Sequence, residues 1–376
     1  MSPSDVSSID GSPLPATTAT DGMRADLNGL LTRLVQLGGS DLHLTAGSAP
    51  CPRVNGALTP FSDWRPLTPD DTERMVRGVI SEEQWRRFEI ECELDTSYSL
   101  AGVSRFRMNV YRQRGSVAAV FRANPHQIPP LADLDLPSAV ANFAQLNRGL
   151  VLITGPTGSG KTTTLASLLD VANRTRSDHI MTIEDPIEYV HTHRRGLVNQ
   201  REVGTDTADF GGALKHVLRQ DPDIILVGEL RDLETISVAI TAAETGHLVL
   251  ATLHTQSAAQ TVDRLVDVYP PDQQGQIRTQ LANCLQGVVS QSLAPTADGR
   301  GRIAVCEVMV VTPAVRNLIR EGKAHQIPMV LQSSAELGMI SFDQHLAQRY
   351  AADLVSRQTA VDLAHDPNEF LRMARL

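Results

Sequence analysis

The sequence predicts an α/β protein that contains a mainly parallel sheet with helices on both faces, preceded by a smaller α+β unit. In the second part of the chain, short apolar runs alternate with amphipathic segments, which is the order that builds such a sheet. A segment with four prolines, residues 124–137, separates this pattern from the first part, where helices and strands follow no such alternation. A chain of 376 residues is long enough for two domains.

The first unit begins after residues 1–22, whose Ser, Thr, Pro and Ala content is typical of a disordered tail. Leucines at helical spacing predict a helix over 23–37, and alternating polar and apolar residues predict a strand over 41–45. Hydroxyl N-caps and glycine punctuation then predict helices 68–80 and 81–90 and strands 95–100, 104–111 and 116–121. We therefore expect a small α+β domain over 23–123 and a linker over 124–137.

The second unit is expected to span residues 138–311, starting with a short helix over 138–146. Apolar runs predict five strands, 149–154, 179–184, 223–228, 247–252 and 302–310. Amphipathic spacing predicts helices 206–220, 232–245, 257–268 and one that runs from about residue 271 through Leu285 to about Leu293. After Val311 the pattern contains helices alone, which gives a C-terminal helical region over 312–376.

Residues 155–162, Gly-Pro-Thr-Gly-Ser-Gly-Lys-Thr, fit the pattern G-x-x-x-x-G-K-[ST] between a predicted strand and a predicted helix. Glycines let the backbone curl so that N–H groups point at phosphate oxygens, and the helix N-terminus adds partial positive charge. Lys161 would reach the β- and γ-phosphates, and the Thr162 hydroxyl would bind Mg²⁺. We expect ATP to be held by Gly155, Pro156, Thr157, Gly158, Ser159, Gly160, Lys161, Thr162 and Thr163.

Two predicted strands of the second unit end in carboxylates. The strand 223–228 is followed by Glu229, and phosphate-loop enzymes place such a residue beside Mg²⁺ or the attacking water. Glu184, Asp185 and Glu188 lie at the end of the strand 179–184, where one of them would orient or deprotonate the hydrolytic water. The alternative for this segment is a solvated acidic loop.

His247 and His254 lie at the start and just beyond the end of one predicted strand, too far apart to bind one metal together. His254 is a candidate sensor of the γ-phosphate because it stands at the edge where the carboxylates gather. A structural role is the alternative for both histidines. His191 and His193 suggest metal or phosphate binding, but a solvated loop explains them better.

Four arginines lie on the last strands of the first unit, namely Arg105, Arg107, Arg112 and Arg114. Arg105 and Arg107 share one face because the side-chain period of a strand is two. Facing the nucleotide of a neighbouring subunit, they would stabilise transition-state charge as arginine fingers. The alternative is a solvated strand face.

Composition excludes several classes of protein. A net charge of −9 argues against general nucleic-acid binding. No apolar run approaches the roughly 18 residues that a membrane span needs, and the N-terminus lacks the pattern of a signal peptide. The four cysteines are far apart in the sequence, so we expect reduced thiols in a cytoplasmic protein and no metal cluster.

With these residues in view, the chain resembles the secretion-type ATPases of type II secretion and type IV pili over residues 24–365. The run 218–232, LRQDPDIILVGELRD, matches the signature of that family, residues 182–188 resemble its Asp box, and the two histidines resemble its His box. The resemblance implies a RecA-like ATPase core beside a PAS-like N-terminal domain. It also implies that Glu188 is the catalytic carboxylate, that Glu229 is the Walker B residue, and that Arg105, Arg107 and Arg112 reach an adjacent nucleotide.

Two features bear on the branch of the family. Extension and secretion members usually carry a tetracysteine zinc insert, which this sequence lacks, and residues 314–321, AVRNLIRE, match the retraction signature AIRNLIRE except at Val315. The resemblance thus implies a cytoplasmic homohexamer at the inner face of the membrane, which uses ATP and Mg²⁺ to drive pilus retraction through a membrane platform protein. It leaves open an accessory paralogue with little hydrolysis, or a secretion or DNA-uptake ATPase. The acidic balance disfavours direct nucleic-acid binding.

Overall fold

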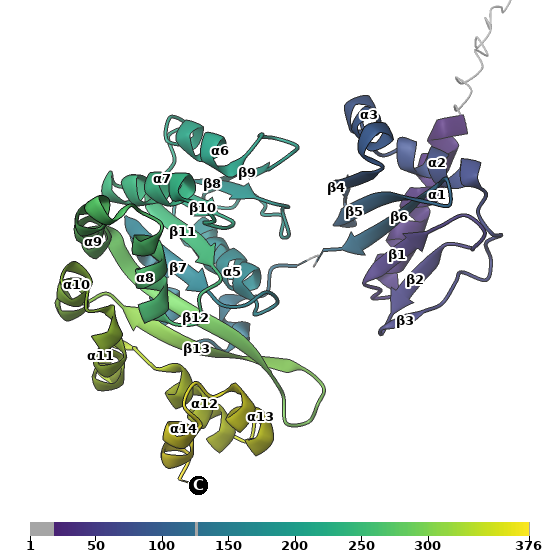
Figure 1. Ribbon diagram of the computed structural model, residues 1–376. Coiled ribbons are helices and arrows are strands. Elements are labelled where there is room, and N and C mark those ends of the chain that lie inside the picture. Colours follow the sequence, from purple (N-terminus) through teal and green to yellow (C-terminus); the bar gives the residue numbers. More distant parts are fainter. Residues whose placement is uncertain (1–18, 125–126, 376) are drawn as a thin grey trace, which may run out of the picture. The chain divides into compact units, whose positions relative to one another are not determined.

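The computed structural model describes residues 19–124 and 127–375, and the chain divides into two units, Met1–His126 and Gln127–Leu376 (Figure 1). The division lies inside the segment 124–137 that was expected to be a linker. The predicted disordered tail is wrong for residues 19–22, because the first helix begins at Ala19. The rest of that predicted tail, residues 1–18, lies outside the described residues.

Unit 1 is an α+β unit with a six-stranded antiparallel sheet in the order β3-β2-β1-β6-β5-β4. Its strands are β1 (Asp41–Leu44), β2 (Cys51–Val54), β3 (Ala57–Leu58), β4 (Glu93–Leu100), β5 (Ser104–Gln113) and β6 (Ser116–Ala123). Its helices are α1 (Ala19–Gln36), α2 (Pro69–Arg77) and α3 (Glu82–Glu91). Leucines of α1 and aromatic residues of the sheet form one buried core, which includes Leu27, Leu31, Phe106 and Phe121.

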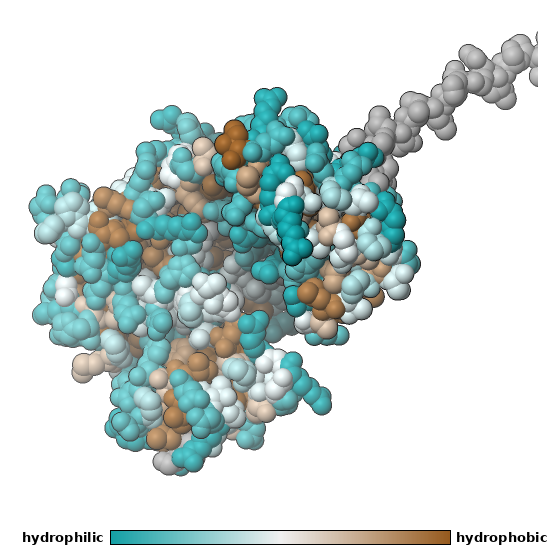
Figure 2. Space-filling view, turned by 45° about the vertical axis from the view of Figure 1, so that its right-hand side comes forward, coloured by the Kyte–Doolittle hydropathy of each residue, from teal (hydrophilic) through white to brown (hydrophobic). Residues whose placement is uncertain are grey.

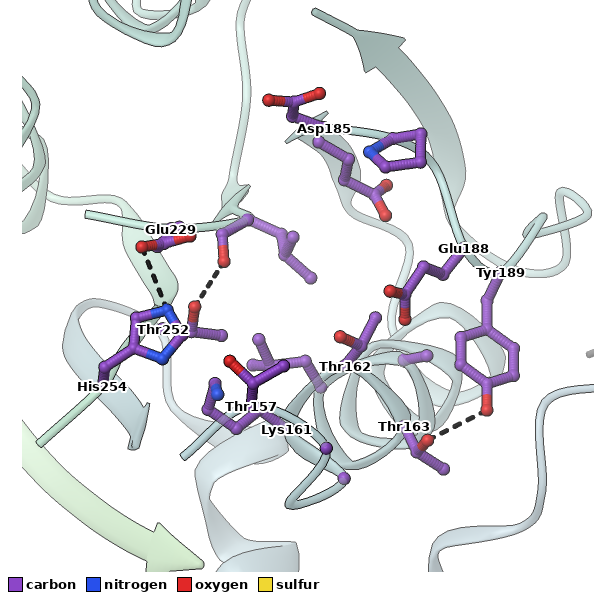
Figure 3. Close-up of a pocket in the computed structure, with 18 of the residues that line it drawn as sticks. Thr157, Lys161, Thr162, Thr163, Asp185, Glu188, Tyr189, Glu229, Thr252 and His254 are labelled. Carbon is purple, nitrogen blue, oxygen red and sulfur yellow. Dashed lines mark hydrogen bonds and ion pairs between the residues drawn. The ribbon is translucent and has the colours of Figure 1, made fainter. Parts of the chain in front are cut away.

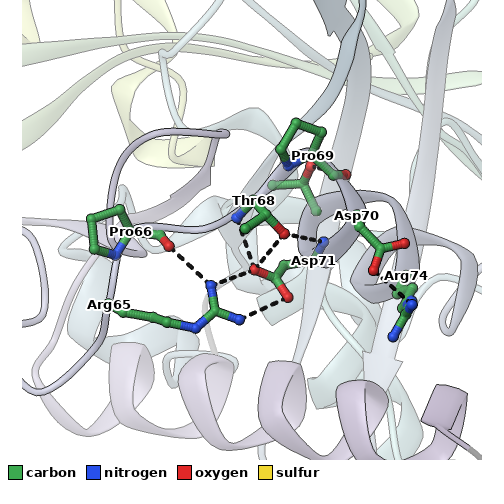
Figure 4. Close-up of polar contacts among 8 residues, drawn as sticks. Arg65, Pro66, Thr68, Pro69, Asp70, Asp71 and Arg74 are labelled. Atoms are coloured by element: carbon green, nitrogen blue, oxygen red, sulfur yellow. Dashed lines mark hydrogen bonds and ion pairs between the residues drawn. The ribbon is translucent and has the colours of Figure 1, made fainter.

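Helix α2 begins at a capping box that a neighbouring arginine reinforces (Figure 4). The Thr68 hydroxyl accepts a hydrogen bond from the Asp71 N–H at 3.2 Å, and the Asp71 carboxylate accepts one from the Thr68 N–H at 2.8 Å. Arg65 donates to both carboxylate oxygens of Asp71, at 2.7 and 3.0 Å. The Arg65 guanidinium holds the pKa of the buried Asp71 well below its usual range.

Unit 2 contains a seven-stranded sheet in the order β13-β12-β7-β11-β10-β8-β9, parallel except for the edge strand β13. Its strands are β7 (Gly149–Thr154), β8 (His179–Glu184), β9 (Leu197–Glu202), β10 (Ile224–Val227), β11 (Leu248–Leu253), β12 (Leu285–Pro295) and β13 (Arg302–Val310). The prediction that the helix from residue 271 continues to about Leu293 is wrong. Helix α9 (Pro271–Cys284) ends at Cys284, and the β-branched, doubly buried run around Val288 and Val289 forms a strand instead.

Helices cover both faces of this sheet, and the alternation of side chains along each strand assigns them (Figure 1). Leu150 and Leu152 of β7 share one buried cluster with α6, α7, α8, α9 and α10, whereas Val151 and Ile153 share another with α4 and α5. These helices are α4 (Ala139–Asn142), α5 (Lys161–Thr175), α6 (Phe210–Val217), α7 (Leu233–Glu244), α8 (Ala258–Asp267) and α10 (Pro313–Arg320). The predicted α/β fold class, with a mainly parallel sheet between two helical layers, is confirmed.

The C-terminal region is helical, as expected, and its last helices pack on the sheet. Besides α10 it contains α11 (Ile327–Ser333), α12 (Phe342–Ala351), α13 (Arg357–Leu363) and α14 (Pro367–Met373), with the short 3₁₀ helices η3 (Ala324–Gln326) and η4 (Ala335–Leu337) between them. Two further 3₁₀ helices, η1 (Leu131–Leu134) and η2 (Phe143–Gln145), precede β7. Phe342, Leu346 and Phe370 form a small core with Ala294 of β12 and Val305 of β13. The C-terminal helices therefore pack on β12 and β13, the last two strands on one side of the sheet.

The visible surface is largely hydrophilic. On the face drawn in Figure 2, apolar residues form separate small patches among polar ones. Among the described residues, no helix combines the length and the apolar character needed to cross a bilayer.

Candidate active site

The candidate active site lies where the parallel strands of unit 2 end. Strand pairing aligns Thr154 at the end of β7 with Leu253 of β11, and Val227 at the end of β10 with Ala251 of β11 and Ile183 of β8. Loops that leave these strands therefore meet at one sheet edge, which is where ligands bind in open α/β sheets. They enclose a pocket of about 560 Å³.

The phosphate loop forms the floor of this pocket between the fully buried strand β7 and helix α5 (Figure 3). Gly155, Gly158 and Gly160 adopt φ values of +138°, +79° and +88°. L-residues with side chains rarely adopt these values, so the sequence pattern of glycines is explained by the backbone path. Gly160 is the N-cap of α5, which places the positive end of the helix dipole at the loop.

Gln291 of β12 supports the loop from below, a role that no sequence pattern indicated. Its amide donates to the Ser159 carbonyl at 2.7 Å and accepts from the Thr164 hydroxyl at 2.8 Å. A Cβ added to Gly155 would lie 2.1 Å from the Gln291 carbonyl oxygen. A helix was predicted over this segment, and a helix would not place Gln291 under the loop. Only a strand paired with β7 does so.

Lys161 begins α5 and lies against the loop that it follows. Its ammonium group donates to the carbonyls of Gly155 at 2.8 Å and Pro156 at 3.0 Å. Burial lowers the pKa of Lys161 below its usual value, and the carboxylates of Glu229 and Glu188 oppose that shift. Two acidic groups are thus close enough to this cation to influence its charge.

Glu229 lies just beyond β10 and contacts Arg231 and His254, of which Figure 3 shows the contact with His254. One carboxylate oxygen is 2.9 Å from the Arg231 guanidinium, and the other is 3.1 Å from Nε2 of His254. Burial alone would raise the pKa of Glu229, but Arg231 and His254 outweigh it and hold that pKa below its usual value. The lowered pKa favours the ionised carboxylate, and the contacts with Arg231 and His254 orient it.

Glu188 faces the pocket from the loop that follows β8, near Thr162 at the first turn of α5 (Figure 3). On the same loop, the Tyr189 hydroxyl is 2.9 Å from the Thr163 hydroxyl, which ties the loop to α5. Glu184, at the end of β8, is buried, and burial raises its pKa although hydrogen bonds from Thr182 and Gln200 oppose the shift. Asp185 and Glu188 are both exposed and both line the pocket, and the Glu188 carboxylate faces its interior near Thr162 (Figure 3).

His247 is not brought to the pocket. It precedes β11 at the opposite end of that strand from His254, and its ring Nδ1 lies 3.0 Å from the Ala242 carbonyl. Within the chain its contacts are those of a structural residue. His191 does line the pocket, and burial lowers its pKa to about 4.

The predicted arginine fingers belong to unit 1, and each has contacts there. Arg105 donates to the hydroxyls of Ser99 at 2.7 Å and Ser97 at 2.6 Å. Arg107 lies 3.9 Å from the Asp95 carboxylate, and the Arg112 guanidinium lies 5.2 Å from the centre of the Phe88 ring. Their action on a neighbouring subunit stays a prediction.

The oxygen groups at the pocket suit a magnesium ion bound together with phosphate. The Thr162 hydroxyl and the Glu229 carboxylate line the same pocket, and Mg²⁺ prefers few protein oxygens supplemented by substrate phosphates and water. Within the described parts of the chain, no group of three or more His, Cys, Asp or Glu side chains is arranged to hold a metal by itself. The pocket thus fits a metal that arrives with its substrate.

Comparison with known proteins identifies the family. The family model described as "Type II/IV secretion system protein" matches residues 133–350. The chain is 46% identical over 345 residues to the "Type IV pilus retractation ATPase PilT" of Pseudomonas aeruginosa, covering 92% of this chain and 100% of that protein. It is 43% identical over 347 residues to the "Type IV pilus ATPase PilU" of the same organism, covering 92% of this chain and 91% of that protein.

A solved structure agrees with these relatives. The crystal structure of the pilus retraction motor PilT with bound ADP superimposes with a TM-score of 0.86 at 46% identity, covering 92% of this chain and 99% of that one. The fold is therefore shared over nearly the whole length of both proteins. The chain belongs to the type II/IV secretion system protein family.

Proposed function

We propose that the chain is an ATPase that powers the retraction of type IV pili. The observation that carries the proposal is the meeting of the phosphate loop, Glu188 and Glu229 at one pocket, in a chain similar throughout its length to a retraction ATPase. ADP in the related motor supports a nucleotide as the ligand of the equivalent loop.

Binding of ATP uses the floor of the pocket. Loop N–H groups and those at the N-terminus of α5 donate hydrogen bonds to the phosphate oxygens. Lys161 exchanges its contacts with two carbonyls for contacts with the β- and γ-phosphates. Thr162 and Glu229 would hold Mg²⁺, which when bound neutralises charge that develops on the transferred phosphoryl group.

Hydrolysis requires a water molecule aligned with the γ-phosphate. Glu188 is an exposed carboxylate that faces the pocket near Thr162, and it orients that water and takes its proton. His254 contacts the Glu229 carboxylate. When His254 turns toward or away from the γ-phosphate, Glu229 loses or regains this partner, which is how the γ-phosphate is sensed.

Turnover by the purified protein tests this assignment. Glu188→Gln keeps the shape of the side chain but removes the base, so the hydrolysis rate should fall at least about 100-fold while nucleotide binding persists. Lys161→Ala should abolish binding and hydrolysis together. Exposed Glu336, outside the pocket, provides a matched control as Glu336→Gln, which should leave the rate unchanged.

A rate close to that of the parent protein in Glu188→Gln would remove the role assigned to Glu188. ATP binding without turnover in the parent protein would instead favour the accessory paralogue.

We further propose a homohexamer in which Arg105, Arg107 or Arg112 acts on the nucleotide of the next subunit. Lys161→Ala and Arg107→Ala subunits, each inactive alone, should regain hydrolysis when mixed, because some interfaces then join an intact pocket to an intact arginine. No recovery for any of the three arginines would contradict action between subunits.

The proposed cellular setting is the cytoplasmic face of the inner membrane, where the hexamer acts on a pilus platform protein. Deletion of the gene should leave cells with pili that extend but do not retract. Normal retraction with a loss of secretion or of DNA uptake would assign the motor to another machine of the same family.

A further inference from the structure

The loop that carries Glu188 is fastened by its neighbours rather than by Glu188 itself. We call residues 185–191, between β8 and β9, the Glu188 loop. Among the described residues, the Glu188 side chain makes no hydrogen bond or ion pair with another side chain or with the backbone. Its position over the pocket must therefore come from the backbone on either side of it.

Gln200 of β9 holds the backbone after Glu188. Its amide nitrogen donates to the Tyr189 carbonyl at 2.9 Å, and its amide oxygen accepts from the His191 N–H at 2.7 Å. The same nitrogen also donates to the Glu184 carboxylate at 3.0 Å. Both N–H groups and the oxygen of this amide are thus committed, which fixes its orientation.

Glu202, two residues further along β9, holds the backbone before Glu188. Its carboxylate accepts a hydrogen bond from the Ile187 N–H at 2.9 Å, and the side chain is only 2% exposed. Gln200 and Glu202 share one face of the strand because they are two positions apart.

These contacts bracket Glu188 on both sides. Ile187 and Tyr189 are each held from β9, and the Tyr189 hydroxyl also contacts Thr163 of α5. A carboxylate that removes a proton from water must lie within hydrogen-bond reach of it, and a misplacement of about 1 Å can cost on the order of 100-fold in rate.

We propose that Gln200 and Glu202 are positioning residues for hydrolysis, which act by setting where Glu188 stands over the phosphate loop. The inference rests on the proposed role of Glu188. Neither residue lines the pocket, so each acts through the loop and not on the nucleotide.

The test uses Gln200→Met in the full-length protein, which keeps the length of the side chain and removes its donors and acceptor. We expect kcat to fall about 10- to 100-fold while KM and the dissociation constant for ADP stay within about 2-fold. Asn199→Leu is the matched control, because Asn199 lies on the same strand and loses a hydrogen bond to His179 without touching the Glu188 loop. It should leave kcat unchanged.

Glu202 provides an independent arm. Glu202→Gln keeps an oxygen that accepts from the Ile187 N–H and should retain most of the rate, whereas Glu202→Leu should lose it as Gln200→Met does. A purely structural role would lower the unfolding temperature, the ADP affinity and kcat together, and that pattern would overturn the proposal.

Combination with Glu188→Gln separates this inference from the proposed function. If Gln200 acts through Glu188, adding Gln200→Met should not lower the residual rate of Glu188→Gln further, since residues that act as a unit are not additive. An active Glu188→Gln variant would refute the proposed role of Glu188. An inactive Glu188→Gln with a normal Gln200→Met would refute only the positioning role.

Discussion

Two separate restrictions require glycine at position 155 of the phosphate loop. The Gly155 φ of +138° disfavours any side chain, and an added Cβ would lie 2.1 Å from the backbone oxygen of Gln291 on a central strand. That strand is buried between β7 and β13, so it has little freedom to withdraw.

Gly155→Ala should therefore displace the loop and lower ADP affinity at least about 10-fold, equivalent to about 1.4 kcal/mol. Gly299→Ala is the control, because Gly299 has a φ of +69° with open space around it. That variant should lose about 1–2 kcal/mol of stability from backbone strain alone and bind ADP normally. Equal ADP affinities of the two variants, measured by calorimetric titration, would contradict the steric argument.

At the scale of elements, Glu307 links three parts of unit 2. It lies on β13, accepts from the Ala258 N–H at the start of α8 at 2.7 Å, and accepts from the backbone of Phe342 at the start of α12. Burial raises the pKa of Glu307 from 4.5 to about 7, and these backbone hydrogen bonds oppose the shift only in part. The folded protein therefore favours the protonated form of Glu307, where β13, α8 and α12 meet.

The stability of unit 2 should depend on pH through this residue. Because the folded protein holds the proton more tightly than the unfolded chain, the contribution of Glu307 is fully present below about pH 4.5 and is lost as pH rises through about 7, by on the order of 3 kcal/mol. Glu307→Gln keeps an acceptor for Ala258 but does not titrate. Its unfolding temperature relative to the parent protein should rise between pH 5 and pH 8, and a constant difference would contradict the shift.

Elements also show what the sequence could predict and what it could not. The strands β7 and β8 are recognisable as apolar runs, and most helices show apolar residues at helical spacing. Hydroxyl or carboxylate caps such as Thr68 and Asp232 mark where helices start. Strand β12 was missed because α9 runs into it at Leu285 with no glycine or proline between them. The helical spacing of α9 thus gave no sign of where it stops.

Strand β9 was missed for a different reason, which concerns the site itself. Its inward positions after Val198 are Gln200 and Glu202, so the hydrophobic alternation that identifies a strand is absent. These polar residues face inward because they bind the Glu188 loop. The phosphate loop, Glu188, Glu229 and His254 could be expected at one sheet edge from strand ends alone, whereas residues that act from a polar strand could not.

At the scale of the molecule, the two units have separate cores. The core of unit 1 includes Phe106 and Phe121, and the clusters of unit 2 include Leu152 and Phe342. Over residues 19–124 and 127–375, no residue belongs to the cores of both units. Each core is large enough to unfold as a cooperative body. The candidate nucleotide pocket is lined by residues of unit 2.

Scanning calorimetry should therefore resolve two transitions, of which ADP shifts one. At a free concentration 100 times its dissociation constant, ADP should add about 2.7 kcal/mol to the unfolding of unit 2 and leave unit 1 unchanged. Lys161→Ala should show both transitions without the shift. A single transition that ADP moves as a whole would contradict independent cores.

The position of β9 has a consequence for how the protein fails when it is warmed. Among the strands of the described residues, β9 lies at the edge of the sheet and pairs with β8 alone. Edge segments open by fluctuation more readily than central ones, so amide hydrogens of β9 should exchange with deuterium sooner than those of β7. Catalysis should then decline at temperatures where nucleotide is still bound and the cores are still intact. Opening of β9 frees the Glu188 loop, so the Glu188 carboxylate moves away from its position over the phosphate loop.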